Sequence, residues 1–140
     1  MASELRVNTL KDAAGNNSVG MEYVANGTAK SWINFNGNGT PAARDSFNFS
    51  SITDNATGDY TVNISNAFAT ANYVTHSSGT YADGNTSSVN DAALVGLTRG
   101  ITNPLTTSSG RYINFARAGS GGTTLYDAPY ILISSTGDLA

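Results

Sequence analysis

The chain has 140 residues, enough for one domain of ordinary size, and its formal net charge is −3. Its seven basic residues are scattered singly and form no patch for a phosphate backbone, which excludes nucleic-acid binding. The absence of cysteine excludes disulfides, thiol catalysis and cysteine-ligated zinc. No stretch approaches the ~20 apolar residues of a membrane span, so we expect no membrane insertion.

Asparagine, serine, threonine and glycine make up 64 of the 140 residues, whereas glutamate and lysine occur only twice each. This composition favours turns and strands over surface helices, and it excludes a helical bundle or coiled coil. Only 37 side chains are large and apolar, so the core is thin and a partner subunit would enlarge it. The composition therefore predicts an all-β chain.

Residues 3–10 alternate apolar and polar residues, with Leu5 and Val7 on one face, which predicts a strand; a turn-rich break follows at residues 12–18. Residues 20–28 predict a short turn or an extended link. A lone strand is unstable in water, so this one pairs with the body, with another copy or with a different protein. We treat residues 1–28 as an arm and link; a first strand of the domain is the alternative. The docking candidates in the arm are Leu5, Val7 and Leu10.

Residues 29–140 show strand patterns separated by polar turns, with no helical period between them. This rhythm predicts a small antiparallel β-sandwich of about seven strands. The expected core anchors are Trp32, Ile33 and Phe35. The expected strands are residues 31–35, 46–52, 60–64, 72–77, 92–98, 111–116 and 129–134.

Two of these strands, 46–52 and 60–64, are expected to form a hairpin with a loop of about six to eight residues. Phe47 and Phe49 are expected on one face of the first strand. The alternation of the second strand predicts that Tyr60, Val62 and Ile64 point inward.

Residues with catalytic or metal-binding chemistry are scarce. His76, the only histidine, lies in a predicted strand between threonine and serine, where a surface position is expected. No Gly-x-Ser-x-Gly motif precedes a helix, so no nucleophile is indicated. Residues 54–59 have the oxygen ligands for Ca²⁺ but lack the closing glutamate of an EF-hand, and a hairpin turn is favoured. We expect no catalytic residue, no metal and no cofactor.

Aromatic residues in loops rich in asparagine, serine and threonine are typical of sugar contacts, because rings stack on sugars while amides and hydroxyls bond sugar hydroxyls. Packing of the same rings back over the sandwich remains an equal alternative. The loop candidates for receptor contact are Tyr81, Asn85 and Tyr126.

Several stretches resemble the tail-fibre-like virion proteins of tailed phages, notably marine and cyanobacterial ones. Residues 3–15 are similar to the N-terminal segment of these proteins, and residues 29–37 are similar to the start of their fibre module. The resemblance covers about residues 3–76. Its most specific part comprises residues 44–55 and 58–63, continuing through 67–68 and 71–74.

This resemblance implies a β-rich, commonly homotrimeric structural protein without catalytic residues. It implies a short fibre or tail appendage, made in the host bacterial cytoplasm and located in the virion. Its expected partners are other virion proteins and a host surface glycan. Two alternatives remain open: a head decoration protein that stabilises the capsid, and a cellular carbohydrate-binding module.

Overall fold

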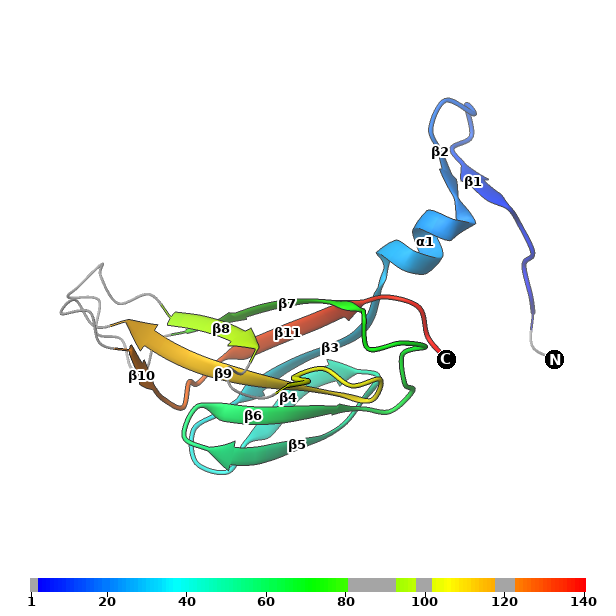
Figure 1. Ribbon diagram of the computed structural model, residues 1–140. Coiled ribbons are helices and arrows are strands. Elements are labelled where there is room, and N and C mark those ends of the chain that lie inside the picture. The colour runs from blue at the N-terminus through cyan, green and yellow to red at the C-terminus, as the bar shows by residue number, and fades with distance from the viewer. Residues whose placement is uncertain (1–2, 81–92, 98–101, 118–122) are drawn as a thin grey trace.

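The computed structural model describes residues 3–80, 93–97, 102–117 and 123–140 of the chain. In these residues the protein is all-β: two antiparallel sheets face each other, and an N-terminal arm extends away from them (Figure 1). The antiparallel sandwich predicted from the sequence is confirmed.

The first sheet consists of β3 (Ala29–Asn36), β4 (Ala42–Phe47), β7 (Val74–Gly79) and β11 (Ile131–Thr136). Their order across the sheet is β4-β3-β11-β7, with every neighbouring pair antiparallel. The C-terminal strand β11 thus lies between β3 and β7, which come much earlier in the chain. This order brings residues that are distant in sequence onto one sheet face.

The second sheet consists of β5 (Phe49–Ala56), β6 (Asp59–Ile64), β8 (Ala93–Leu97), β9 (Ser109–Arg117) and β10 (Thr123–Leu125). β9 pairs with β8 along one edge, and with β6 and then β10 along the other. β5 pairs with the far side of β6. The described part of the body therefore holds two strands more than predicted, because β10 is too short for a recognisable period and the strand predicted over 46–52 is divided.

Asn48 divides that predicted strand. Its backbone φ is 52°, in the left-handed region that asparagine tolerates better than most residues. The chain passes here from the first sheet into the second. Phe47 is consequently 54% exposed on the outside, whereas Phe49 packs against the core. The prediction that these two phenylalanines share a face is wrong.

The hairpin of β5 and β6 is confirmed, but its loop is only Thr57 and Gly58, shorter than the predicted loop of about six to eight residues. Gly58 has a φ of 65°, and a Cβ there would lie 2.7 Å from the backbone oxygen of Asn114. Glycine permits both the left-handed turn and this close approach. Residues 54–59, expected to form a hairpin turn, therefore lie mostly in β5 and β6.

The core lies between the two sheets. The edge-to-face contact of Phe35 and Tyr60, with ring centroids 5.3 Å apart, joins the two layers at its centre. The inward direction predicted for three side chains of β6 is confirmed, because Tyr60, Val62 and Ile64 are all buried. The main cluster contains Ile33, Phe35, Tyr60, Val62, Tyr112, Ala128, Ile131 and Ile133.

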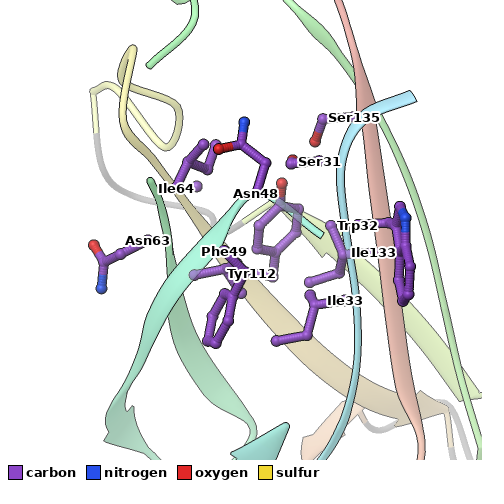
Figure 2. Close-up of a pocket in the computed structure, with 12 residues that line it drawn as sticks. Ser31, Trp32, Ile33, Asn48, Phe49, Asn63, Ile64, Tyr112, Ile133 and Ser135 are labelled. Atoms are coloured by element: carbon purple, nitrogen blue, oxygen red, sulfur yellow. The ribbon is translucent and has the colours of Figure 1, made fainter. Parts of the chain in front are cut away.

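Trp32 lies on the other side of β3 from this core. Figure 2 shows its ring across the strand from Ile33, and the residue is 37% exposed. Successive side chains of a strand point to opposite faces, so Trp32 cannot share the interior with Ile33 and Phe35. The prediction of Trp32 as a core anchor is wrong, while those of Ile33 and Phe35 are confirmed.

The N-terminal arm precedes β3 and belongs to neither sheet of the sandwich. It contains a small hairpin of β1 (Thr9–Lys11) and β2 (Ser18–Gly20), followed by the helix α1 (Met21–Gly27). The strand expected at residues 3–10 is thus reduced to its last residues, and it pairs within the arm. The helix corrects the short turn or extended link expected over residues 20–28.

Candidate functional site

Apolar side chains of the arm are exposed. β1 and β2 pair Leu10 directly with Val19, so the two share one face of the hairpin. Leu5, ahead of the hairpin, is 80% exposed, and Tyr23 of α1 is 69% exposed. With Val7, these residues form what we call the arm surface. The structure leaves all three predicted docking side chains, Leu5, Val7 and Leu10, open to solvent.

The turn of the arm hairpin is held by Asp12. Its carboxylate accepts hydrogen bonds from the backbone N–H of Asn16 at 2.9 Å and from the side-chain amide of Asn17 at 2.7 Å. The bond from Asn17 is the main reason why the pKa of Asp12 is lowered. Local bonds of this kind give the arm a defined shape without support from the sandwich.

The loop candidates for receptor contact are only partly placed. Tyr81 and Asn85 lie outside the described residues. Tyr126 packs against the main core, and its hydroxyl donates to the backbone oxygen of Thr80 at 3.0 Å. The ring of Tyr126 therefore packs against the sandwich.

The outer face of the first sheet gathers side chains from all four of its strands. Residues that pair directly across an antiparallel ladder share a face, and Trp32 pairs with both Phe47 and Ser134. The register places two ranks on this face: Phe47, Trp32, Ser134 and His76 in one, and Asp45, Asn34, Leu132 and Ser78 in the next.

An open groove of about 610 Å³ follows these ranks, and we call it the outer groove. This volume falls in the range of small-ligand sites, ~300–1,000 Å³. Trp32 and Leu132 supply its apolar surface, and both are more than one-third exposed. Its polar side chains, among the described residues, are Asn34, Asp45, His76, Ser78 and Ser134.

Sequence reasoning missed the outer groove. The alternation of β3 already contained one signal, because Trp32 has the opposite parity from Ile33 and Phe35. His76, expected at the surface, is exposed as predicted and lies on this face.

The polar groups of the outer groove are poorly satisfied. Within the described residues, the side chains of Asn34, His76 and Ser134 make no hydrogen bond, and Asn34 Oδ1 is shielded from solvent without a partner. Elsewhere the strand asparagines use their amide donors: Asn63 donates to Ser51, and Asn114 donates to the backbone of Tyr126, although Asn114 Oδ1 is also buried without a partner. Asn34 therefore keeps amide donors that Asn63 and Asn114 use within the sandwich.

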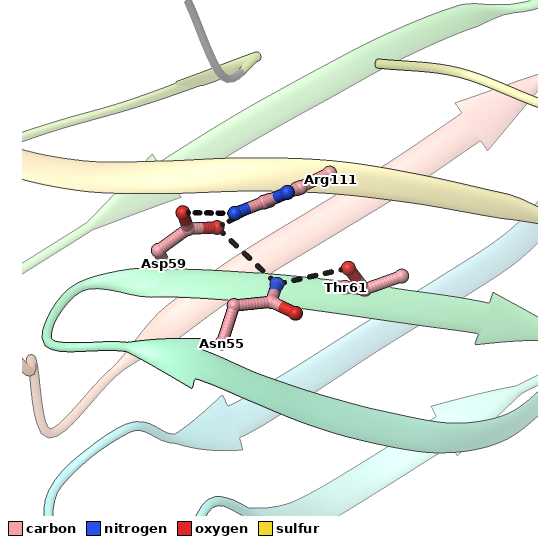
Figure 3. A network of polar contacts seen from close by, with 4 residues as sticks. All are labelled: Asn55, Asp59, Thr61 and Arg111. Carbon is pink, nitrogen blue, oxygen red and sulfur yellow. Dashed lines mark hydrogen bonds and ion pairs between the residues drawn. The ribbon is translucent and has the colours of Figure 1, made fainter. Parts of the chain in front are cut away.

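The segment considered for Ca²⁺ is occupied by an ion pair. Arg111 donates from Nε to Oδ1 of Asp59 at 2.9 Å and from Nη2 to Oδ2 at 2.8 Å (Figure 3). Asn55 also donates to Asp59, and it bonds Thr61 at 2.9 Å. The Arg111 bonds hold the pKa of Asp59 below its usual range. Both carboxylate oxygens thus serve to join β5, β6 and β9.

A second cavity lies between the sheets (Figure 2), but its volume is only about 10 Å³. This is about the space of one water molecule. Burial raises the pKa of the Tyr112 hydroxyl beside it, while bonds to Thr75 and Ser135 act in the opposite direction. The cavity belongs to the core and has no room for an organic ligand.

In the described ranges, no cluster of three or more histidine, aspartate or glutamate side chains is arranged to hold a metal ion. Among the described residues, no helix is long and apolar enough to cross a membrane. Comparison of the chain with protein-family models, with curated proteins and with solved structures found no match.

Proposed function

We propose that this chain is a non-enzymatic structural protein of a phage virion. It acts as a short fibre or tail-appendage subunit that docks on the particle through its N-terminal arm and contacts a glycan on the host surface. The proposal combines the sequence resemblance of residues 3–76 with the geometry of the arm and the sandwich.

The observation that carries the proposal is the exposed apolar surface of an arm that belongs to neither sheet. Leu5 and Tyr23 are among the most exposed apolar side chains described. Removing apolar surface of this kind from water contributes about 25 cal/mol per Å² to association. The segment ahead of β1 is extended and in no described strand, so it can also add a strand to a partner sheet.

The compact body favours a second candidate, a head decoration protein. The described body is one sandwich with no repeating shaft, which suits a subunit that clamps its neighbours as well as one that reaches outward. The number of copies per particle separates the two functions. A number comparable with the capsid subunits supports decoration, and far fewer copies support a fibre or tail appendage.

The docking role is tested with the full chain carrying Leu5→Asp and Leu10→Asp together. We expect the wild-type protein to cosediment with virus particles purified from its source, and the double variant to lose at least tenfold in affinity. Circular dichroism checks that the sandwich remains folded.

Leu125→Asp is the matched control, because Leu125 is 40% exposed, much like Leu10, but lies on β10 in the sandwich. It should cosediment like the wild type. Undiminished binding of the arm variant, or failure of a specific antibody to label any particle in electron micrographs, would contradict the proposal.

A further inference from the structure

The outer groove combines one flat aromatic ring with several unused polar groups. Trp32 is 37% exposed beside Leu132, and the neighbouring side chains include an amide, an imidazole, a carboxylate and hydroxyls. An apolar ligand would leave most of these polar groups unbonded, which costs free energy when they are desolvated. The surface needs a ligand that is apolar on one side and rich in hydroxyls around its edge.

A pyranose ring has this distribution of groups. Its axial C–H groups make an apolar face that packs on an indole ring, and its equatorial hydroxyls both donate and accept hydrogen bonds. Asn34 offers donors and an acceptor, while Asp45 offers acceptors only. Oδ1 of Asp45 already accepts the N–H of Ser46 at 2.8 Å, which fixes the carboxylate beside the groove.

The charges around the groove favour a neutral ligand. Among the described residues, its lining contains one carboxylate, Asp45, and no lysine or arginine. Arg44 of the same strand is engaged elsewhere: it donates to the backbone oxygen of Pro129 at 2.7 Å and stacks 4.3 Å from the ring centroid of Tyr130. A sulfated or carboxylated sugar would meet a like charge without a cation to pair with it.

We propose that the outer groove binds a neutral oligosaccharide, with one sugar stacked on Trp32 and its hydroxyls bonded by Asn34 and Asp45. The proposal rests on the glycan contact within the proposed function, and it assigns that contact to this sheet face. Asn34 lies at the bottom of the groove. Rotation about χ2, a broad torsion in asparagine, turns Oδ1 of its side-chain amide toward a sugar hydroxyl.

The experiment uses the intrinsic fluorescence of the full chain, because Trp32 is its only tryptophan and reports on the groove directly. The protein is titrated with cellohexaose, maltohexaose, chitohexaose and mannohexaose, and with a heparin hexasaccharide as the anionic comparison. At least one neutral chain should shift the emission saturably, and heparin should not. Absence of binding by all four neutral chains at millimolar concentration overturns the proposal.

Variants are measured by calorimetry, because Trp32→Ala removes the fluorophore. Trp32→Ala should abolish sugar binding, and Asn34→Leu, which keeps the side-chain volume, should weaken it at least tenfold. Tyr23→Ala removes an exposed aromatic ring from the arm and should leave binding unchanged. Equal binding by wild type and both groove variants would assign the sugar to another surface and overturn the proposal.

The same variants distinguish this site from the docking role. Trp32→Ala and Asn34→Leu should still cosediment with particles, whereas the arm variant should still bind the sugar. If Trp32→Ala instead reduces the native mass of the assembly, the groove is a contact between copies of the chain, and the proposal fails while arm docking stands.

Discussion

Asp59 and Arg111 connect two neighbouring strands of the second sheet through a bidentate ion pair. Asp59 is buried, whereas about one-third of the Arg111 side chain is exposed. Solvent therefore screens part of the attraction, but both carboxylate oxygens keep charge-assisted bonds. Loss of the carboxylate charge removes the partner of Arg111 and leaves the amide of Asn55 with a weaker acceptor.

We expect Asp59→Asn to lower the free energy of unfolding near neutral pH by about 1–2 kcal/mol. The folded-state pKa of Asp59 is lowered, so its stabilising effect is complete above the ordinary carboxyl value of 3.8 and is lost as the pH falls through the folded-state pKa. The stability gap between wild type and variant should therefore close on acidification. Urea unfolding over this pH range measures it.

Asp54→Asn is the control for this prediction, because Asp54 is an exposed carboxylate on the same hairpin and no described bond reaches its side chain. It should change stability little at any of these pH values. A gap for Asp59→Asn that persists undiminished in acid would show that the carboxylate is not the source of the effect.

The opposite positions of Trp32 and Phe35 on β3 lead to different costs of truncation. Phe35 is fully buried, so Phe35→Ala should destabilise by about 3–5 kcal/mol. Trp32→Ala removes a side chain that is 37% exposed on the outer face, and we expect a loss of about 1 kcal/mol. Thermal and urea unfolding of the two variants compare them directly. A loss for Trp32→Ala as large as for Phe35→Ala would place the indole in the interior.

At the scale of elements, Asn48 sets the crossing from β4 to β5. Its side-chain amide donates to the backbone oxygens of Lys30 and Asn66, both at 3.0 Å, and its Oδ1 accepts the N–H of Asn66 at 2.7 Å. These bonds hold the residue at a positive φ, where the backbone of most residues other than glycine and asparagine is strained.

This geometry predicts an order of stability for two substitutions. Asn48→Gly loses the side-chain bonds but keeps an unstrained backbone, whereas Asn48→Ala loses the bonds and strains the backbone as well. The alanine variant should therefore be less stable than the glycine variant by about 1 kcal/mol, and both should be less stable than wild type. Chemical denaturation gives the order; an alanine variant equal to or better than the glycine variant would contradict the assigned φ.

The sequence predicts the elements whose signal is local. The period of two in residues 60–64 is enough to place β6 and its inward face, and the tryptophan's parity could have placed it outside. The division at Asn48 could not be predicted, because its left-handed φ depends on partners 18 residues away in each direction. The outer groove could not be predicted for the same reason: strand order and register bring His76 and Leu132 beside Trp32.

At the scale of the whole molecule, the two sheets present different outer faces. On the second sheet, Asn63 bonds Ser51 and Asn55 bonds Thr61, so the polar side chains of that face satisfy one another. On the first sheet, Trp32, Phe47 and Leu132 remain exposed among unbonded polar groups. Recognition is therefore expected on the first sheet and on the arm.

The resemblance to phage fibre proteins implies that the protein is a trimer. β4 and β5 each have a described strand on one side only, and closing copies around an axis covers such edges. We expect native mass spectrometry to give three times the chain mass of 14.5 kDa. Deleting residues 2–15 should leave a folded trimer, because the arm belongs to neither sheet and contributes nothing to the described core. A monomeric full chain would count against the fibre function, whereas a trimer that dissociates only on deletion would make the arm the contact between copies.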